Sequence, residues 1–172
     1  MKNAKRTSTL ILVTTLSLLA ACNSDTDDQE VSASPGQWTS HGADHSSSKY
    51  AALDQINAAN FTDLEIAWRW ESADYRVPDD LLYFTGDYRA TPLMVNGVVY
   101  QATNHGQVAA LDPATGEEFW IFDPESYKLG QPNFSPAQTR GIEYWTDGEV
   151  ERIFIATLGK QLVSIDITTG LP

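Results

Sequence analysis

Three histidines and a single cysteine are the side chains of this chain that are best suited to bind a metal or to act as a nucleophile. His41 and His45 are four residues apart and look like a metal-binding pair. No third ligand lies near them, and serine, glycine and aspartate surround them, so this segment is predicted to be a loop and not a metal site. His105 closes a strand-like run in the segment Thr103–Gly106, where it could donate a hydrogen bond to a ligand or lie in solvent.

The chemistry of Cys22 depends on the sequence before it. Three basic residues precede an apolar run, Leu10 to Ala21, which is shorter than the roughly 20 residues that a membrane-spanning helix needs. Residues 1–22 are therefore predicted to be a cleaved export signal. Leu19-Ala20-Ala21-Cys22 resembles the lipobox of bacterial lipoproteins, in which the thiol takes a diacylglycerol. The alternative is a plain signal peptide with an incidental cysteine.

A lipid on Cys22 would hold the processed chain on a membrane. Asn23 stands where a signal for retention in the inner membrane usually has aspartate, which favours the outer membrane, on its periplasmic side. Residues 23–37 are polar and acidic and are predicted to be a flexible tether, so the folded part is predicted to begin near Trp38. Because the only cysteine is at the lipid site, no internal disulfide is predicted in this exported chain.

The charge of the chain argues against one large class of partners. The formal net charge is -12; all 23 acidic residues follow Cys22, whereas three of the 11 basic residues precede it, so the processed chain carries -15. Phosphate backbones repel such a chain, and no cluster of lysine or arginine interleaves with aromatic residues. Nucleic acid is therefore not a predicted partner.

Short runs rich in β-branched and aromatic residues predict an all-β fold with antiparallel strands. Glycine, asparagine, aspartate and proline separate these runs. The predicted strands lie within Ile66–Trp70, Pro92–Thr103, Gln107–Leu111, Phe119–Phe122, Arg152–Thr157 and Gln161–Ile165. Asn96-Gly97 predicts a type I′ hairpin, since both residues accept a positive φ angle. Asn104–Gln107 and Gly159-Lys160 predict further tight turns.

An internal repeat predicts how these strands are organised. Asp112 and Gly116 belong to an Asp-x-x-Thr-Gly segment, and Asp166 and Gly170 belong to a second copy 54 residues later. A four-stranded propeller blade takes about 40–50 residues, so the spacing fits one blade with a loop insertion. Trp120 is predicted to pack between neighbouring blades. The sequence thus predicts about the first two blades of a truncated β-propeller, which alone is not expected to fold stably or to catalyse a reaction.

The repeat and its flanks resemble the quinoprotein dehydrogenases, which depend on pyrroloquinoline quinone (PQQ). Five residues match the tryptophan-docking motif of that family: Ala110, Asp112, Thr115, Gly116 and Trp120. The opening segment from Trp38 to Trp68 is also similar, as are Ala90–Val95 and Arg140–Trp145. The resemblance covers residues 38–172.

The resemblance implies an eight-bladed propeller that holds PQQ near its axis, beside a calcium ion and an aspartate base. The calcium ligands and the base are expected after residue 172. Arg140 falls on the arginine of the family's Arg-Gly-x-x-Tyr-Trp segment, and its planar cation suits a PQQ carboxylate or quinone oxygen. A structural ion pair is the alternative for Arg140. His105 lies where membrane glucose dehydrogenases have a histidine close to the quinone, which implies a cofactor contact.

Arg89 departs from the family pattern. Many relatives have glutamate at this position, immediately before Ala90-Thr91-Pro92. A cation there could strengthen the binding of a cofactor carboxylate, and it changes the local electrostatics. The pair of adjacent disulfide-bonded cysteines that marks the alcohol-oxidising branch is absent, which favours a branch like the membrane glucose dehydrogenases.

The resemblance as a whole implies a fragment of a PQQ-dependent oxidoreductase. Such an enzyme would oxidise an aldose sugar or an alcohol in the periplasm and pass the electrons to a quinone or a cytochrome. The alternative is a propeller lipoprotein without a cofactor that acts as an outer-membrane assembly scaffold. Trp38–Trp68 and Arg140–Trp145 favour the dehydrogenase, because such scaffolds are not expected to carry them. Arg89 leaves a third possibility open, a structural propeller that has lost PQQ binding.

Overall fold

The computed structural model describes residues 36–44, 46–81, 86–130 and 138–172. These residues belong to one compact unit, Val31–Pro172. The predicted export signal, Cys22 and residues 23–35 of the predicted tether lie outside the described residues. Within the described ranges, no helix is long and apolar enough to cross a membrane.

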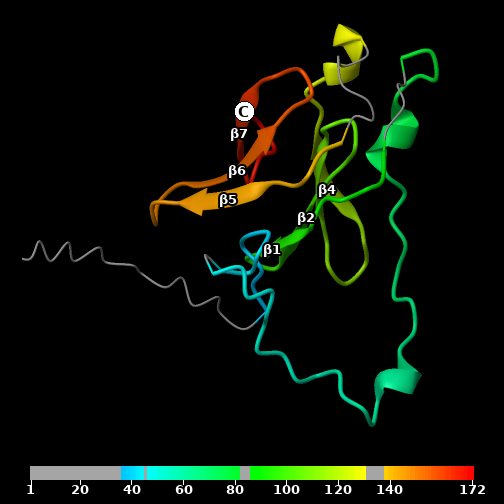
Figure 1. Cartoon of the computed structure of the whole chain (residues 1–172), viewed down its shortest axis with the longest axis vertical. Coiled ribbons are helices and arrows are strands. Elements are labelled where there is room, and N and C mark those ends of the chain that lie inside the picture. The colour runs from blue at the N-terminus through cyan, green and yellow to red at the C-terminus, as the bar shows by residue number, and fades with distance from the viewer. Residues whose placement is uncertain (1–35, 45, 82–85, 131–137) are drawn as a thin grey trace, which may run out of the picture. The chain divides into compact units, whose positions relative to one another are not determined.

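Two antiparallel sheets make up the regular structure (Figure 1). The first has four strands in sequence order: β1 (Leu93–Val95), β2 (Val98–Ala102), β3 (Val108–Leu111) and β4 (Glu118–Phe122). The second has three: β5 (Glu143–Thr146), β6 (Glu151–Ala156) and β7 (Leu162–Asp166). Three short 3-10 helices lie outside the sheets: η1 (Phe61–Asp63), η2 (Ala73–Arg76) and η3 (Ser126–Leu129). The described part of the chain is thus one four-stranded blade followed by three strands that repeat its order.

Most strand predictions are confirmed, but one observed strand was not predicted and one predicted strand is not in a sheet. Strand β5 was not predicted, because Glu143–Thr146 is only four residues long and begins with glutamate, although its other residues are of strand-forming types. Ile66–Trp70 is not part of a sheet in the structure, although it was predicted as a strand. Its main attachments among the described residues are instead two tryptophan side chains, described below.

The tight turns also follow the prediction. Asn96 and Gly97 have φ angles of 51° and 78°, as a type I′ hairpin requires. The β2–β3 turn begins at Thr103, whose hydroxyl accepts a hydrogen bond from the Gln107 N–H at 3.1 Å. In the β6–β7 turn the Thr157 hydroxyl accepts from the Gln161 N–H at 3.3 Å. These two turns repeat the same 54-residue spacing as the Asp-x-x-Thr-Gly segments.

The two Asp-x-x-Thr-Gly segments form the same turn. Asp112 Oδ1 accepts hydrogen bonds from the N–H groups two and three residues later, at 2.7 and 2.9 Å, and Asp166 Oδ1 does so at 3.0 and 2.9 Å. Hydrogen bonds from these backbone groups hold the pKa values of both carboxyls below their usual range. Gly116 and Gly170 close the turns with φ angles of 76° and 70°.

Each of these glycines lies directly against the ring of a tryptophan. A Cβ atom on Gly116 would lie 2.6 Å from the ring of Trp68, and one on Gly170 would lie 2.6 Å from the ring of Trp120. The Trp68 indole N–H donates to the Pro113 carbonyl at 2.8 Å, and the Trp120 indole N–H donates to the Ile167 carbonyl at 3.0 Å. The predicted blade-to-blade packing of Trp120 is confirmed. Trp68 makes the same contact with the first blade.

The residues around Trp68 are held in place by the start of β4. The Glu118 carboxylate accepts from the Trp70 indole N–H at 2.6 Å and forms an ion pair with Arg76 at 2.5 Å. The Arg76 hydrogen bonds hold the pKa of Glu118 below its usual range. Ile66–Trp70 therefore lies against the first blade in the way that β4 lies against the second sheet.

The sheets share one apolar core. Val99 pairs with Leu111 in the first sheet, and Ile153 pairs with Ile165 at the corresponding place in the second. Buried members of the core include Leu93, Val95, Tyr100, Val108, Ala110, Ile142, Ile153, Ile155 and Ile165. The rings of Tyr100 and Trp120 lie 5.8 Å apart in this core. Burial raises the pKa of Tyr100 to about 12.

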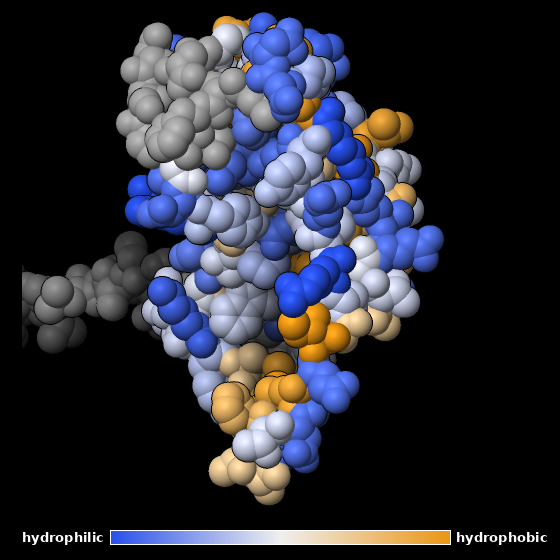
Figure 2. Space-filling view, turned by 90° about the vertical axis from the view of Figure 1, so that its right-hand side faces the viewer, coloured by the Kyte–Doolittle hydropathy of each residue, from blue (hydrophilic) through white to orange (hydrophobic). Residues whose placement is uncertain are grey.

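Large apolar side chains also reach the surface. Figure 2 shows hydrophobic groups among charged ones on one face of the molecule. The exposed large apolar residues between 50 and 66 are Tyr50, Leu53, Ile56, Phe61, Leu64 and Ile66. Single exposed apolar residues are ordinary, but a run of six in one segment is typical of a surface that another part of a protein covers.

Candidate functional site

The two sheets approach each other at the segments that precede their first strands. Thr91, two residues before β1, and Gly141, two residues before β5, form a parallel backbone bridge. A Cβ atom on Gly141 would lie 3.8 Å from the Thr91 nitrogen, so the two backbones are close at this point. The bridge brings together two residues that the sequence singled out, Arg89 and Arg140.

Arg89 and Arg140 line one hollow with a volume of about 450 Å³. The lining also contains an imidazole, a carboxylate and apolar groups from β6 and β7. The full set is His41, Arg89, Arg140, Gly141, Ile142, Glu143, Phe154, Ala156 and Leu162. We call this site the arginine hollow.

The charges of the arginine hollow favour an anionic ligand. Arg89 Nη2 lies 3.3 Å from Asp87 Oδ2, and both side chains are largely exposed, so water screens this pair. Arg140 takes part in none of the ion pairs formed among the described residues. Glu143 is the one acid in the lining. An exposed guanidinium can donate two parallel hydrogen bonds to a carboxylate, which makes Arg140 the strongest anion ligand here.

His41 enters the arginine hollow from a distant part of the sequence. Its Nδ1 lies 2.9 Å from the Thr91 hydroxyl, in a hydrogen bond whose direction depends on the tautomer. The sequence interpretation treated His41 only as a loop residue. No spacing rule connects residues 50 positions apart, so nothing in the sequence marked this contact.

His105 lies elsewhere, in a buried polar cluster. Its side chain is 6% exposed, and Nδ1 lies 3.3 Å from Asp74 Oδ1 of η2. The Asp74 carboxylate also accepts from the N–H groups of Asn104 at 3.1 Å and His105 at 3.4 Å. His105 does not line the arginine hollow, and its cofactor contact stays a prediction.

Asp74 is held in its charged form despite partial burial. Burial by itself raises the pKa of this carboxyl, but hydrogen bonds from His105 and Thr103, with the charge of His105, together hold the pKa below its usual value. The carboxylate thereby attaches η2 to the β2–β3 turn. The phenol of Tyr88 lies nearby and donates to the Ala102 carbonyl at 2.7 Å. Burial and the Asp74 charge raise its pKa to about 12.

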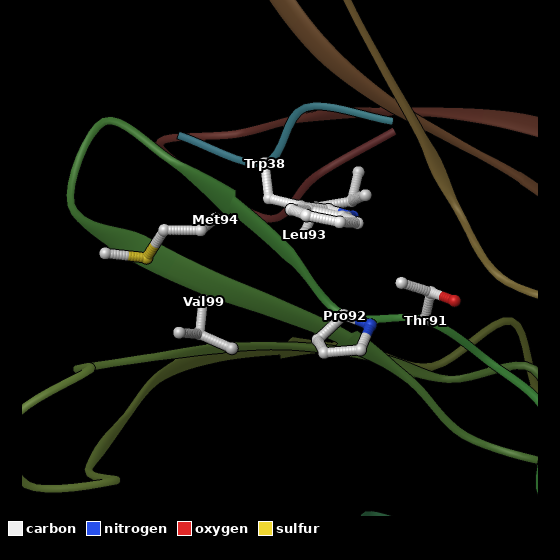
Figure 3. A pocket seen from close by; sticks show the side chains of 6 residues that line it. All are labelled: Trp38, Thr91, Pro92, Leu93, Met94 and Val99. Carbon is white, nitrogen blue, oxygen red and sulfur yellow. The ribbon is translucent and has the colours of Figure 1, made fainter. Parts of the chain in front are cut away.

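A second hollow, beside β1, is apolar (Figure 3). It has a volume of about 250 Å³ and is lined by Trp38, Thr91, Pro92, Leu93, Met94 and Val99. Trp38 and Met94 exchange backbone hydrogen bonds of 2.8 and 2.9 Å, so the start of the fold adds to the β1 edge of the first sheet. The six residues include no charged side chain. The hollow therefore offers no charged ligand for an anion, and Trp38 packs against its lining.

Metal ligands are not gathered in the part of the chain that the structure describes. There, no group of three or more histidine, cysteine, aspartate or glutamate side chains could hold an ion. The predicted calcium ligands concern residues after 172, so the calcium ion stays a prediction.

The chain matches a known family over its whole folded part. Residues 38–172 match the β-propeller domain of the glucose/ethanol/alcohol dehydrogenases, the family labelled PQQ. The quinohemoprotein alcohol dehydrogenase ADH IIB of Pseudomonas putida is 32% identical over 173 aligned positions, covering 99% of this chain and 23% of the relative. Quinoprotein glucose dehydrogenase A of Acinetobacter calcoaceticus is 32% identical over 108 positions, covering 63% of this chain and 13% of the relative.

A solved structure gives the same picture. The structure of quinohemoprotein alcohol dehydrogenase ADHIIG from Pseudomonas putida superposes with a TM-score of 0.65 and 29% identity, covering 80% of this chain and 18% of that one. The chain thus spans about a quarter or less of the length of these relatives.

Proposed function

The chain belongs to the PQQ-dependent glucose/ethanol/alcohol dehydrogenase β-propeller family, and we propose that it forms the first blades of an oxidoreductase. The substrate is the hydroxyl group of an alcohol or of an aldose sugar, and a quinone or a cytochrome accepts the electrons. The enzyme works on the periplasmic side of a bacterial membrane, to which a lipid on Cys22 attaches it. The observation that carries this proposal is that Arg89 and Arg140 meet in one hollow.

The donor set of the arginine hollow fits PQQ, which carries several carboxylates. Arg140 binds one carboxylate through its planar fork, and Arg89 contributes a second positive charge. When bound, PQQ supplies the acceptor for the hydride that leaves the substrate. The departure at Arg89 is compatible with this fit, because a second cation stabilises an anionic cofactor.

Contacts among the described residues position the backbone that carries the two arginines. The Thr91–Gly141 bridge joins the two segments, and the Trp120 contact with Ile167 joins the two sheets. The fold therefore brings the two arginine positions to one place before a ligand binds, which supports a cofactor site there.

The substrate and the metal are the finer parts of the proposal. Both named relatives oxidise hydroxyl compounds according to their names, one as an alcohol dehydrogenase and one as a glucose dehydrogenase. The absence of adjacent cysteines favours the glucose-dehydrogenase-like branch. Calcium would be held by residues outside this chain.

The proposal is tested on the protein translated from the complete reading frame. The purified protein is titrated with PQQ and calcium, and reduction of an electron-accepting dye is followed with glucose and with simple alcohols. We expect reduction that depends on substrate and requires both additions. A folded protein that neither binds PQQ nor reduces the dye would contradict the proposal and favour the scaffold lipoprotein.

A further inference from the structure

We propose that His41 is a third ligand of the anionic group that binds in the arginine hollow, beside Arg89 and Arg140. This inference rests on the proposed function and assigns a role to a residue outside the two arginine segments. The three side chains come from three separate parts of the chain, yet all line the same hollow. A histidine there gives the site a further N–H donor beside the two guanidinium groups.

The contact with Thr91 defines which ring atom of His41 is available. Nδ1 is engaged with the Thr91 hydroxyl at 2.9 Å, which leaves Nε2 for a ligand. When the hydroxyl donates to Nδ1, the proton of the neutral ring is on Nε2, which can then donate to an anion. In the protonated ring Nδ1 donates to the hydroxyl and Nε2 again carries a proton. Both of these forms present an N–H donor to the hollow.

The backbone around His41 is fixed on both sides. Three residues earlier, Trp38 is paired with Met94 of β1 by two hydrogen bonds. One residue later, Gly42 packs so closely that a Cβ atom would lie 2.7 Å from the Ser47 hydroxyl and 2.8 Å from the Ser47 Cα. The Gly42 carbonyl also accepts from the Lys49 N–H at 2.9 Å. His41 is therefore held in place by backbone contacts and is not on a free loop.

The charges that share the lining with His41 favour an anion. Arg89 and Arg140 are two guanidinium groups, and Glu143 is the one acid in the lining. A ligand carboxylate can therefore accept hydrogen bonds from the guanidinium groups and from the imidazole N–H together.

The test measures binding and not turnover. Quenching of tryptophan fluorescence gives the dissociation constant of PQQ for the full-length protein and for H41Q. We expect H41Q to bind about tenfold more weakly than the wild type, the size of a lost hydrogen bond to a charged group. K49Q is the matched control, since it removes a positive charge from the same loop without lining the hollow, and its affinity should be unchanged.

Two further variants, T91V and R140Q, distinguish a wrong role for His41 from a wrong proposed function. T91V removes the hydroxyl that holds Nδ1 with little change of shape, and it should weaken binding in the same direction as H41Q. If H41Q and T91V bind like the wild type while R140Q binds weakly, the role of His41 is wrong and the proposed function stands. If R140Q has no effect either, or if the wild type does not bind PQQ, both proposals are overturned. Circular dichroism of each variant verifies that it is folded.

Discussion

Arg89 and Arg140 carry the same charge but differ in what they already contact. Arg89 has a carboxylate partner in Asp87, at 3.3 Å. Arg140 takes part in none of the ion pairs among the described residues. A ligand anion must compete with Asp87 for Arg89, but within the described ranges it meets no ion-paired carboxylate at Arg140. At the residue scale, Arg140 is therefore expected to contribute more to anion binding.

This difference can be measured with matched neutral substitutions. R140Q is expected to weaken PQQ binding by about tenfold or more, as for a lost charge-assisted hydrogen bond, and R89Q by a smaller factor. R140K should recover only part of the affinity, because an ammonium group cannot form the planar fork. Equal losses in R140Q and R89Q would contradict the expected competition from Asp87, and full affinity in R140K would show that Arg140 acts only through its charge. Titration of each variant with PQQ gives the comparison.

Asp74 gives a second prediction at the residue scale, for stability against pH. Its folded-state pKa is lowered, so it stabilises the fold above the unfolded-state pKa of about 3.9, and this contribution is lost as the pH falls through the folded-state value. D74N is expected to cost about 1–3 kcal/mol of unfolding free energy at neutral pH, since charged hydrogen bonds to Asn104 and His105 become neutral ones.

The pH dependence separates the charge of Asp74 from the shape of its side chain. The gap in urea-unfolding free energy between the wild type and D74N should shrink below about pH 4. The exposed Asp79 provides the control, and D79N should leave the unfolding free energy unchanged both at neutral pH and below about pH 4. A gap that is constant with pH would mean that the substitution acts through packing alone.

At the scale of the element, the blade-to-blade contact is the repeated feature. Trp68 and Trp120 rest on equivalent glycines and donate to carbonyls of equivalent residues, Pro113 and Ile167. Strand β4 supplies Trp120 from the outer edge of the first blade. Ile66–Trp70 supplies Trp68 in the same way, although it is not part of a sheet. This segment therefore has the position of the outer strand of a preceding blade.

The close contacts of Gly116 and Gly170 with tryptophan rings can be tested by comparison with a glycine that has a similar φ angle but no near neighbour. G116A and G170A add a Cβ that would lie 2.6 Å from a tryptophan ring, at φ angles of 76° and 70°. G97A has a similar φ of 78° but meets nothing within 4 Å. The positive φ costs about 1–2 kcal/mol in all three, and crowding should add about 1–3 kcal/mol in the first two.

Chemical unfolding of the three variants measures these costs. If G97A proved as destabilising as G116A and G170A, crowding against the tryptophan rings would add nothing to the cost of the positive φ angle. W68F and W120F complement this test, because each keeps an aromatic ring but removes the indole N–H. Each should lose about 0.5–1.5 kcal/mol, as for a typical hydrogen bond.

At the scale of the whole molecule, the chain combines an acidic surface with uncovered apolar groups. The formal net charge is -12, and six large apolar residues between 50 and 66 are exposed. Negative charge keeps such a chain in solution, whereas the apolar residues favour contact with further protein surface. Both features fit a chain that spans 23% of the length of its Pseudomonas putida relative.

Attachment to a membrane is the prediction that belongs to this scale. A wild-type protein with a diacylglycerol on Cys22 should sediment with bacterial membranes and should gain the mass of the lipid on its N-terminal peptide. The N-terminal peptide of C22S should not gain this mass, because serine cannot take the lipid that the thiol takes. Fractionation of cells and mass spectrometry of the peptide check both points. A wild-type protein that is soluble in the periplasm and free of lipid would support the plain signal peptide.

The sequence by itself determined the blades, because their information is local and periodic. Asn96-Gly97 sets a hairpin through its φ preferences, and the two Asp-x-x-Thr-Gly turns form through hydrogen bonds between near neighbours. The repeat of 54 residues then predicts two copies of one unit, and the family follows from the same residues. Strand β5 was missed because it has only four residues and begins with glutamate, although Tyr144, Trp145 and Thr146 are of strand-forming types.

Only the tertiary structure decided which residues share a site. His41, Arg89 and Arg140 line one hollow because the Thr91–Gly141 bridge and the His41–Thr91 contact join segments about 50 residues apart. His105 lies with Asp74 in a buried cluster and does not line that hollow, and its predicted cofactor contact stays a prediction. Contacts of this kind depend on how the sheets pack, and no local propensity or spacing records that packing.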